Sequence, residues 1–422
     1  MTEATQQPEG SSEPTPVSDE LLDRWATDAA GPVALYLKQE LVPVEVNDEH
    51  RVIYPPTYAD IGYNIDTLAD GTRVALIDSV GSQANRLEPI FLSDRDDRDE
   101  WLVPQIEIVL REEPCGECDP CKAAAASSGK KAKKPGCEQP RKVKRSILDL
   151  AHRSADAVVH ASPTLAPEMS KAFDALSRDG DAGPLCTLAP TSLVFGVWDS
   201  RGGSGEKRPR LVRSIIRAWD VEPLHAAAQF NSLWKTLDEE QRTELKKEAE
   251  RQKTKLSEKG LADAPATFRK TKVPEYRDGA PNPEARVLGG VRVRGRIERE
   301  ITVNLVALRG LRGKDDTETK EIQKYLLGLS LMAATAEIDL YLREGCHLRY
   351  TGNDAWYAVP RRGEPQSVSL GTQEARKAVE DYVEKAATRF RTNWPETLEH
   401  KFDVKEAKKL LAKKNDDGPA GE

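Results

Sequence analysis

The chain has 422 residues, of which 38% are hydrophobic and 32% are charged, and its net charge at pH 7 is −7. Such a low apolar fraction predicts a core of moderate size with long polar excursions. The longest apolar run is shorter than a membrane span and the first residues lack a signal segment, so we expect a soluble, cytoplasmic protein that does not enter a membrane. Basic residues are clustered in segments, which leaves nucleic acid open as a ligand of this acidic chain.

The first third of the chain predicts strands separated by polar segments. Residues 1–30 are polar and proline-bearing, and we expect them to form a disordered tail. A helix is predicted over residues 79–89, where Pro89 would end it. Apolar alternation predicts strands over residues 32–46, 52–58, 72–78 and 105–110.

The middle of the chain carries the most basic loop. Residues 146–159 place apolar side chains near one face and predict a helix. The apolar, β-branched run 193–198 predicts a strand, which opens into a basic glycine loop over residues 199–212. Residues 235–290 predict an insertion made of an exposed charged helix, residues 236–259, followed by a loop rich in proline and glycine.

The remaining elements are strands and longer helices. Residues 291–297 alternate apolar and basic side chains, which predicts a strand with one buried and one cationic face. Residues 347–359 predict a pair of strands around Gly352 and Asn353. Helices are predicted over residues 317–336, 372–391 and 404–413. The sum is an α+β fold with long insertions, which suits an RRM-like (ferredoxin-like) fold at least as well as a doubly wound sheet.

The glycine loop and its basic flank suggest a surface that binds phosphates. Residues 202–205 (Gly-Gly-Ser-Gly) are followed by Lys207, Arg208, Arg210, Arg213 and Arg217, with Glu206 as the single acid. A second basic set, Arg292, Arg294 and Arg296, lies on the alternating run. The other interpretation is a hairpin loop whose basic residues are merely solvated. The chain lacks the phosphate-binding motif GxxxxGK[ST] and a strand-linked GxGxxG, so we expect no site for nucleotide hydrolysis.

Four of the six cysteines are grouped in a basic insertion over residues 111–146. Cys115, Cys118 and Cys121 are each separated by two residues, and Cys137 follows in a lysine-rich segment. Two-residue spacings allow successive thiolates to converge on one tetrahedral ion, so we expect a structural Zn²⁺. An iron–sulfur cluster is the second possibility and a set of unligated thiols the third.

Three segments together resemble one protein family. They are residues 79–88 (SVGSQANRLE), 191–200 (TSLVFGVWDS) and 303–312 (VNLVALRGLR). They resemble the backbone subunit of type I-G (formerly I-U) CRISPR Cascade complexes, a member of the RAMP superfamily, and the likeness runs from about residue 32 to about residue 349. The resemblance implies a modified RRM-like palm over residues 31–400, followed by a C-terminal helix and tail over residues 401–422.

The resemblance also implies a function in antiviral defence. Such subunits polymerise along the CRISPR RNA (crRNA) as a helical filament, contact the other Cascade subunits and leave the bases of the guide to pair with target DNA. Matching positions place Ser82, Gln83, Asn85 and Arg86 at the RNA-facing start of a helix, although these groups could instead cap local backbone. The remaining expected RNA-binding residues are Arg201, Lys207, Arg208, Arg210, Arg213, Arg217, Arg292, Arg294, Arg296, Arg309 and Arg312.

The alternative function is a RAMP-type endoribonuclease acting on CRISPR RNA. Such an enzyme needs a general base, and His152, His160 and His225 are candidates, yet the sequence gives none of them a recognisable partner. Asp199 borders the glycine loop, where we expect it to accept hydrogen bonds from backbone N–H groups. We therefore expect that the protein is not an enzyme.

Overall fold

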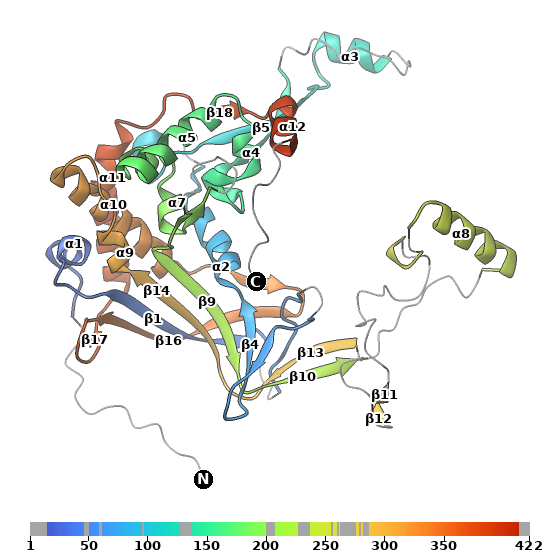
Figure 1. The fold of residues 1–422 in the computed structure, drawn as a ribbon, viewed down its shortest axis with the longest axis horizontal. Coiled ribbons are helices and arrows are strands. Elements are labelled where there is room, and N and C mark those ends of the chain that lie inside the picture. The colour runs from blue at the N-terminus through green and yellow to red at the C-terminus, as the bar shows by residue number, and fades with distance from the viewer. Residues whose placement is uncertain are drawn as a thin grey trace.

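The computed structural model describes residues 15–45, 50–58, 61–94, 97–126, 137, 139–199, 207–226, 237–254, 256–259, 261, 276–277, 280–281 and 287–412. Its centre is a curled antiparallel sheet with helices packed against one face (Figure 1). The α+β class predicted from the sequence is therefore confirmed. Within the described residues, every helix is too short or too polar to span a bilayer.

The strands of the described residues fall into one large sheet and several small ones. The large sheet has the order β15-β16-β1-β14-β9-β4-β3, and all of its neighbouring strands are antiparallel. The strands are β1 (Ala34–Pro43), β2 (Val52–Ile53), β3 (Ile65–Thr67), β4 (Arg73–Asp78), β5 (Glu107–Glu113), β6 (Arg141–Ser146), β7 (Val197–Trp198), β8 (Lys207–Arg208), β9 (Val212–Trp219), β10 (Val221–Ala226), β11 (Tyr276–Arg277), β12 (Ala280–Pro281), β13 (Val287–Val293), β14 (Ile297–Asn304), β15 (Leu340–Arg343), β16 (Cys346–Val359), β17 (Gln366–Ser367) and β18 (Glu399–Lys401).

The helices that cover the sheet include α2, α9 and α10, and α11 packs against α10 (Figure 1). The α-helices are α1 (Asp19–Thr27), α2 (Val80–Leu87), α3 (Asp119–Ala126), α4 (Ala157–His160), α5 (Leu165–Asp174), α6 (Gly183–Leu188), α7 (Pro190–Val194), α8 (Glu239–Arg251), α9 (Leu305–Arg309), α10 (Asp316–Thr335), α11 (Gln373–Arg391) and α12 (Val404–Ala412). Short 3₁₀ or π turns are η1 (Glu88–Phe91), η2 (Arg98–Glu100), η3 (Ile147–Asp149), η4 (Arg153–Ala155), η5 (Ala175–Asp179) and η7 (Leu256–Lys259).

Several elements match the sequence predictions closely. Strand β1 buries every second side chain, as its apolar alternation requires. Helix α2 begins where the Ser79 hydroxyl accepts the N–H of Ser82, and it ends before Pro89. Strand β4 and helices α10, α11 and α12 also lie within one or two residues of their predicted ends, whereas α8 is a helix as predicted but is shorter than the predicted range 236–259.

The predicted strand over residues 193–198 is wrong for most of its length. Pro190 is at the first turn of α7, and this helix continues to Val194 before Gly196, at φ +79°, turns the chain into β7. Residues 191–197 are all buried, so tertiary packing overrides their β propensity. Only Val197 and Trp198 form a strand, which pairs with Arg208 and Lys207 of β8.

Four further predictions need correction. The predicted helix over residues 146–159 is broken into η3, η4 and α4, because Arg153 adopts φ +53° and Asp156 starts a new helix by accepting the N–H of Val158. The prediction of a disordered tail over residues 1–30 is wrong for residues 19–27, which form α1 and bury Leu22 and Trp25.

The other two corrections concern strands. Residues 291–297 cross a turn at Gly295, so they belong to the end of β13 and the start of β14 rather than to one strand. The pair of strands predicted around Gly352 is one continuous strand, β16, with a bulge opposite Glu40, because Gln39 pairs with Asp354 while Leu41 pairs with Tyr350.

The sheet face under the helices holds two apolar clusters. The first contains Leu37 of β1 and Ile301 of β14, together with the buried residues of α2, α7, α9, α10 and α11. The second contains Leu41 and Ile297, farther along the same two strands, together with buried residues of β2, β4, β13 and β15. Polar side chains occupy the positions between the clusters.

This polar belt is centred on Arg299, which is fully buried between Ile297 and Ile301 on β14. Its Nε donates to Gln83 Oε1 (3.1 Å) and Ser214 Oγ (3.2 Å), and Nη1 donates to Gln39 Oε1 (3.2 Å) and the Tyr350 hydroxyl (3.2 Å). Gln39 of β1 is paired with Arg299 in the sheet register, whereas Ser214 of β9 is paired with Ile301, two residues farther along β14. The belt therefore connects four strands, β1, β9, β14 and β16, with helix α2 and separates the two clusters.

We predict that Arg299→Met destabilises the protein by about 3 kcal/mol, because it leaves several buried acceptors without a donor. Arg217→Met is the matched control, since Arg217 lies on the opposite face of β9 in a half-exposed ion pair with Glu300 and should cost less than about 1 kcal/mol. Urea unfolding measures both changes. Equal stability of the Arg299→Met variant and the wild type would show that the belt does not depend on the guanidinium.

Candidate nucleic-acid interface and metal centre

The four residues predicted at the start of α2 separate into internal and exposed groups. Gln83 is fully buried and donates to Asp78 Oδ2 at 2.6 Å, besides accepting from Ser214 and Arg299. Arg86 is half-buried, and it contacts Asp78 Oδ2 (3.1 Å) and the Leu342 carbonyl (3.1 Å). Asn85 is exposed and Ser82 half-buried. Only the latter two are therefore placed to meet a ligand without a rearrangement of the fold.

Strands β7 and β8 form a hairpin that carries the described part of the basic segment. Arg201 and the glycines between these strands lie outside the described residues. Lys207 is exposed, and its Nζ lies 5.7 Å from the centre of the Trp198 ring. Trp198 itself is 59% exposed, and sequence reasoning assigned it only to a buried strand. Trp198 is the second residue of the two-residue strand β7, and its side chain points outward from this strand.

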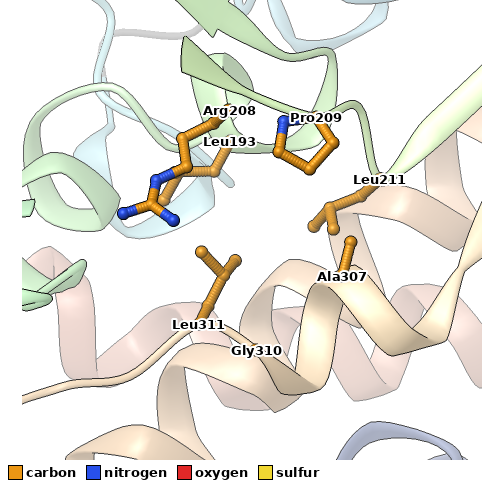
Figure 2. Close-up of a pocket in the computed structure, with 7 residues that line it drawn as sticks. All are labelled: Leu193, Arg208, Pro209, Leu211, Ala307, Gly310 and Leu311. Atoms are coloured by element: carbon orange, nitrogen blue, oxygen red, sulfur yellow. The ribbon is translucent and has the colours of Figure 1, made fainter. Parts of the chain in front are cut away.

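Arg208 lines a small cleft between this hairpin and α9. Figure 2 shows the apolar walls of the cleft, formed by Leu193, Leu211, Leu311 and Ala307, with Arg208 and Pro209 along one side. The Arg208 guanidinium donates to the Leu176 carbonyl at 3.3 Å. The cleft is thus an apolar space beneath one cationic side chain, and its lining offers no group for acid–base chemistry.

Arg210 and Arg153 bring a second cationic group beside α2. The Arg210 stem packs against Gly196, where an added Cβ would lie 2.7 Å from Arg210 Cγ. Partial burial, together with the positive charge of Arg153, lowers the pKa of Arg210. Arg153 also donates to Asn85 Oδ1 at 3.3 Å, so the exposed end of α2 and the basic segment meet here. The sequence places these three residues far apart.

The positive charge of this group is balanced by one buried carboxylate. Arg153 Nε lies 2.6 Å from Glu88 Oε2, and both side chains are almost fully buried. Burial raises the pKa of Glu88 to about 7, against the lowering effects of Arg153 and of a hydrogen bond with Thr191. Asp149 adds a second negative charge near Glu88, and the exposed cationic side chains of this region are those of Lys207 and Arg210.

The arginines of β9 and of the β13–β14 turn are mostly paired with acids. Arg217 Nη1 lies 2.9 Å from Glu300, Arg294 Nη2 2.7 Å from Glu222, and Arg296 Nε 2.6 Å from Glu298. The cationic face predicted for residues 291–297 is therefore largely neutralised. Arg292 is half-buried, and Arg213 is exposed on β9.

The two predicted arginines near α9 have different surroundings. Arg309 donates to the carbonyls of Asp28 and Pro32 and so joins α9 to the segment that precedes β1. Arg312 is exposed, and its carbonyl accepts the N–H of Ala182 at 2.7 Å. Arg309 thus has a structural role, whereas Arg312 remains available at the surface.

Asp199 has a side-chain partner that the sequence did not reveal. It is 1% exposed, and its Oδ1 lies 3.1 Å from Nε2 of His160, whose side chain is also buried. The prediction that each histidine is without a recognisable partner is therefore wrong for His160. The pair lies 39 positions apart in the chain, so no local spacing indicates it.

The four clustered cysteines converge at the end of a hairpin formed by β5 and β6. Cys115 Sγ lies 3.9 Å from Cys121 Sγ, and Cys118 Sγ lies 3.8 Å from Cys137 Sγ. All four sulfur atoms lie within 4.8 Å of one another, close enough to hold one metal ion. N–H groups of Cys118 and Glu117 lower the pKa of Cys115 to about 6, which favours a thiolate.

The strand that follows this cluster is less cationic than its sequence suggests. Lys142 and Lys144 of β6 both contact Glu399 of β18, and Lys144 Nζ also lies 2.8 Å from Glu107 of β5. These ion pairs connect the three strands, because β18 runs parallel to β5 and β6 antiparallel to it. Part of the predicted basic insertion, residues 127–136, lies outside the described residues.

We predict that Arg153→Met destabilises the protein more at pH 8 than at pH 6. Loss of the guanidinium raises the pKa of Glu88 further, so the folded state retains a proton that the unfolded chain has released, and stability falls as the pH rises. Thermal unfolding across this pH range measures the difference. The double variant Arg153→Met/Glu88→Gln should lose the pH dependence, and an unchanged dependence would assign it to another group.

Comparison with known proteins covers the part of the chain that carries this interface. Residues 35–223 match the family described as CRISPR-associated protein GSU0053 (Cas_GSU0053). The matched range extends from β1 into β10, so it contains α2, the cysteine cluster and the β7–β8 hairpin. No curated protein matches the chain. The family match indicates a CRISPR-associated protein.

Proposed function

We propose that this chain is a crRNA-binding backbone subunit of a type I CRISPR surveillance complex. The observation that carries the proposal is the meeting of the exposed side of α2 with the basic segment 207–210, which is far from it in sequence, beside the buried Arg153. Asn85 of α2, Arg210 and Lys207 lie around the β7–β8 hairpin, and all three fall within the range that matches a CRISPR-associated family. A surface that gathers cationic side chains, without a catalytic constellation among the residues that the structure describes, suits a protein that holds an RNA backbone.

The sheet order supports an RRM-like core for this subunit. Strands β16, β1, β14 and β9 are adjacent and antiparallel. Helices, α2 among them, lie between β1 and β9 in the chain, and α10 lies between β14 and β16. Counted in chain order, these strands have the spatial order 4-1-3-2 with helical connections, as in a split βαβ arrangement. We infer that this core is the palm of a RAMP protein and that β3, β4 and β15 extend its sheet.

The partners follow from the proposed complex. The guide RNA would lie along copies of this chain, with its bases left to pair with target DNA, and other Cascade subunits would flank the copies. Recognition of the backbone and not of the bases is what a guide of variable sequence requires. The match to a CRISPR-associated family supports CRISPR RNA and other CRISPR-associated proteins as partners.

An endoribonuclease is the second candidate because His160 and Asp199 form a buried pair beside the hairpin. A general base must reach the proton that it removes, usually within about 3 Å. Both side chains are more than nine-tenths buried, which places them behind the surface rather than on it. Their burial favours a role in anchoring the β7–β8 hairpin, and we propose that the protein is not an enzyme.

We predict that the purified protein binds single-stranded RNA with little dependence on base composition and with an affinity that falls steeply between about 50 and 200 mM salt. Each phosphate contact contributes about −0.7 to the slope of log affinity against log salt. The double variant Lys207→Ala/Arg210→Ala should reduce the size of this slope by roughly 1.4. Lys377→Ala on α11, an exposed lysine paired with Glu380 and Asp381, is the control and should leave the slope unchanged.

Filter binding over a salt series measures these slopes, and gel analysis of the same labelled RNA reports its length. An affinity that is equal at low and high salt would contradict the proposal. Shortening of the RNA that disappears in Asp199→Ala or in His225→Ala would favour the endoribonuclease instead.

We further propose that the cysteine cluster holds a structural Zn²⁺. A tetrahedral ion with Zn–S bonds of about 2.3 Å separates its sulfur ligands by about 3.8 Å. The Cys115–Cys121 and Cys118–Cys137 Sγ–Sγ distances, 3.9 and 3.8 Å, agree with this value and are too long for disulfides. An iron–sulfur cluster spreads its thiolates over several irons, so sulfur atoms this close favour one ion.

We predict about one equivalent of zinc per chain, reduced to a small fraction in Cys118→Ser and retained in Cys186→Ala, whose thiol is buried in the core. Metal loss should expose residues 112–140 to proteases while the palm, which has its own apolar core, unfolds at an unchanged temperature. Elemental analysis and limited proteolysis measure both effects. Less than about one tenth of an equivalent of zinc or iron in fresh wild-type protein would mean that the thiols are unligated, and iron in place of zinc would refute the assignment of zinc.

A further inference from the structure

Trp198 is an exposed aromatic side chain in an otherwise well-packed region. It is 59% exposed, whereas Trp25, Trp101, Trp356 and Trp394 are each at most 8% exposed. A large apolar ring in water raises the free energy of the isolated molecule, so an exposed tryptophan commonly marks a contact surface. Neither the family match nor the sequence prediction of RNA-binding residues includes a role for this ring.

The chain on both sides of Trp198 is buried and therefore fixes its position. Val197 is 7% exposed and belongs to the larger apolar cluster, and Asp199 is 1% exposed with His160 at 3.1 Å. Alternation along a strand directs the side chain between these two residues to the opposite side, which is the solvent. The ring is thus held outward by a rigid backbone, and its ordering costs little when a ligand binds.

One ammonium group lies near the ring, and two arginines follow it in the chain. Lys207 is the cross-strand partner of Trp198 in the β7–β8 hairpin, and its ammonium lies 5.7 Å from the ring centre. Arg208 follows on the same strand, and Arg210 lies beside Gly196, two residues before Trp198. An aromatic face beside positive charges is the combination that single-stranded nucleic acids require, because bases stack while phosphates meet the cations.

We infer that Trp198 stacks on one unpaired base of a single-stranded RNA, with Lys207 and Arg210 at the flanking phosphates. The inference rests on the proposed RNA-binding function and adds a contact to the base itself. Stacking is independent of sequence because every base has a π-face, so the contact is compatible with guides of any sequence. It also gives a reason for the exposure of this one tryptophan.

The test uses two RNA probes of equal length, oligouridine and an oligomer without bases. Removal of a stacking aromatic costs about 1–3 kcal/mol per base, so Trp198→Ala should weaken oligouridine binding about tenfold and leave the affinity for the abasic probe almost unchanged. Trp198→Phe should restore most of the affinity. Tyr341→Ala is the matched control, since Tyr341 is 51% exposed on β15, and it should change neither affinity.

Tryptophan fluorescence supplies a second readout. Oligouridine should quench part of the wild-type emission, and this quenching should be lost in Trp198→Ala. If the wild type binds neither probe, the proposed RNA-binding function is wrong and the stacking contact with it. If the wild type binds both probes equally and Trp198→Ala behaves as the wild type does, RNA binding stands and the stacking contact is refuted.

Discussion

A buried guanidinium organises the sheet of this protein. Arg299 occupies a core position of β14, where an apolar residue would continue the line of Ile297 and Ile301. A buried charge is costly unless hydrogen bonds compensate it, and four side chains from three strands and a helix do so here. Burial lowers the pKa of Arg299, while the negative charges of Asp354 and Asp78 oppose this shift. Because the buried Arg299 guanidinium requires hydrogen-bond partners, β1, β14, β9 and α2 are held in alignment around it.

The same requirement explains why the start of α2 is divided between structure and surface. Gln83 donates to Asp78 and accepts from Arg299, so it completes the belt, while Arg86 extends it to the backbone of β15. Asn85 lies on the exposed side of α2 and meets Arg153 instead. One short helix thus connects the polar interior with the basic surface. Three of the other arginines predicted to bind RNA, Arg217, Arg294 and Arg296, are paired with glutamates, whereas Arg213 and Arg312 stay exposed away from those pairs.

The cysteine hairpin is organised separately from the sheet. Its base is a small three-stranded sheet, β18-β5-β6, joined by lysine–glutamate pairs, and its end carries the four thiols. Exposed ion pairs contribute little to the free energy of unfolding, so these pairs help to set the register of the strands rather than to stabilise the sheet. A segment rich in alanine, glycine and lysine offers little apolar area to bury, which is the physical reason for the metal that we propose at its end.

The sequence alone determined the elements with a clear period or cap: the alternating strand β1, the Ser79-capped helix α2, the long helices α10 and α11, and the spacing of the four cysteines. The strand predicted over residues 193–198 was wrong for most of its length. A buried helix also accommodates β-branched and aromatic residues, and here Pro190 and Gly196 define where the helix begins and the chain turns. Only the tertiary structure decided which cations are neutralised, since Arg217 and Glu300, or Arg153 and Glu88, are distant in the chain and meet through strand register and helix packing. It likewise decided that Trp198 faces solvent between two buried neighbours. Charge and aromatic content are properties of composition, whereas burial and pairing depend on contacts between distant residues.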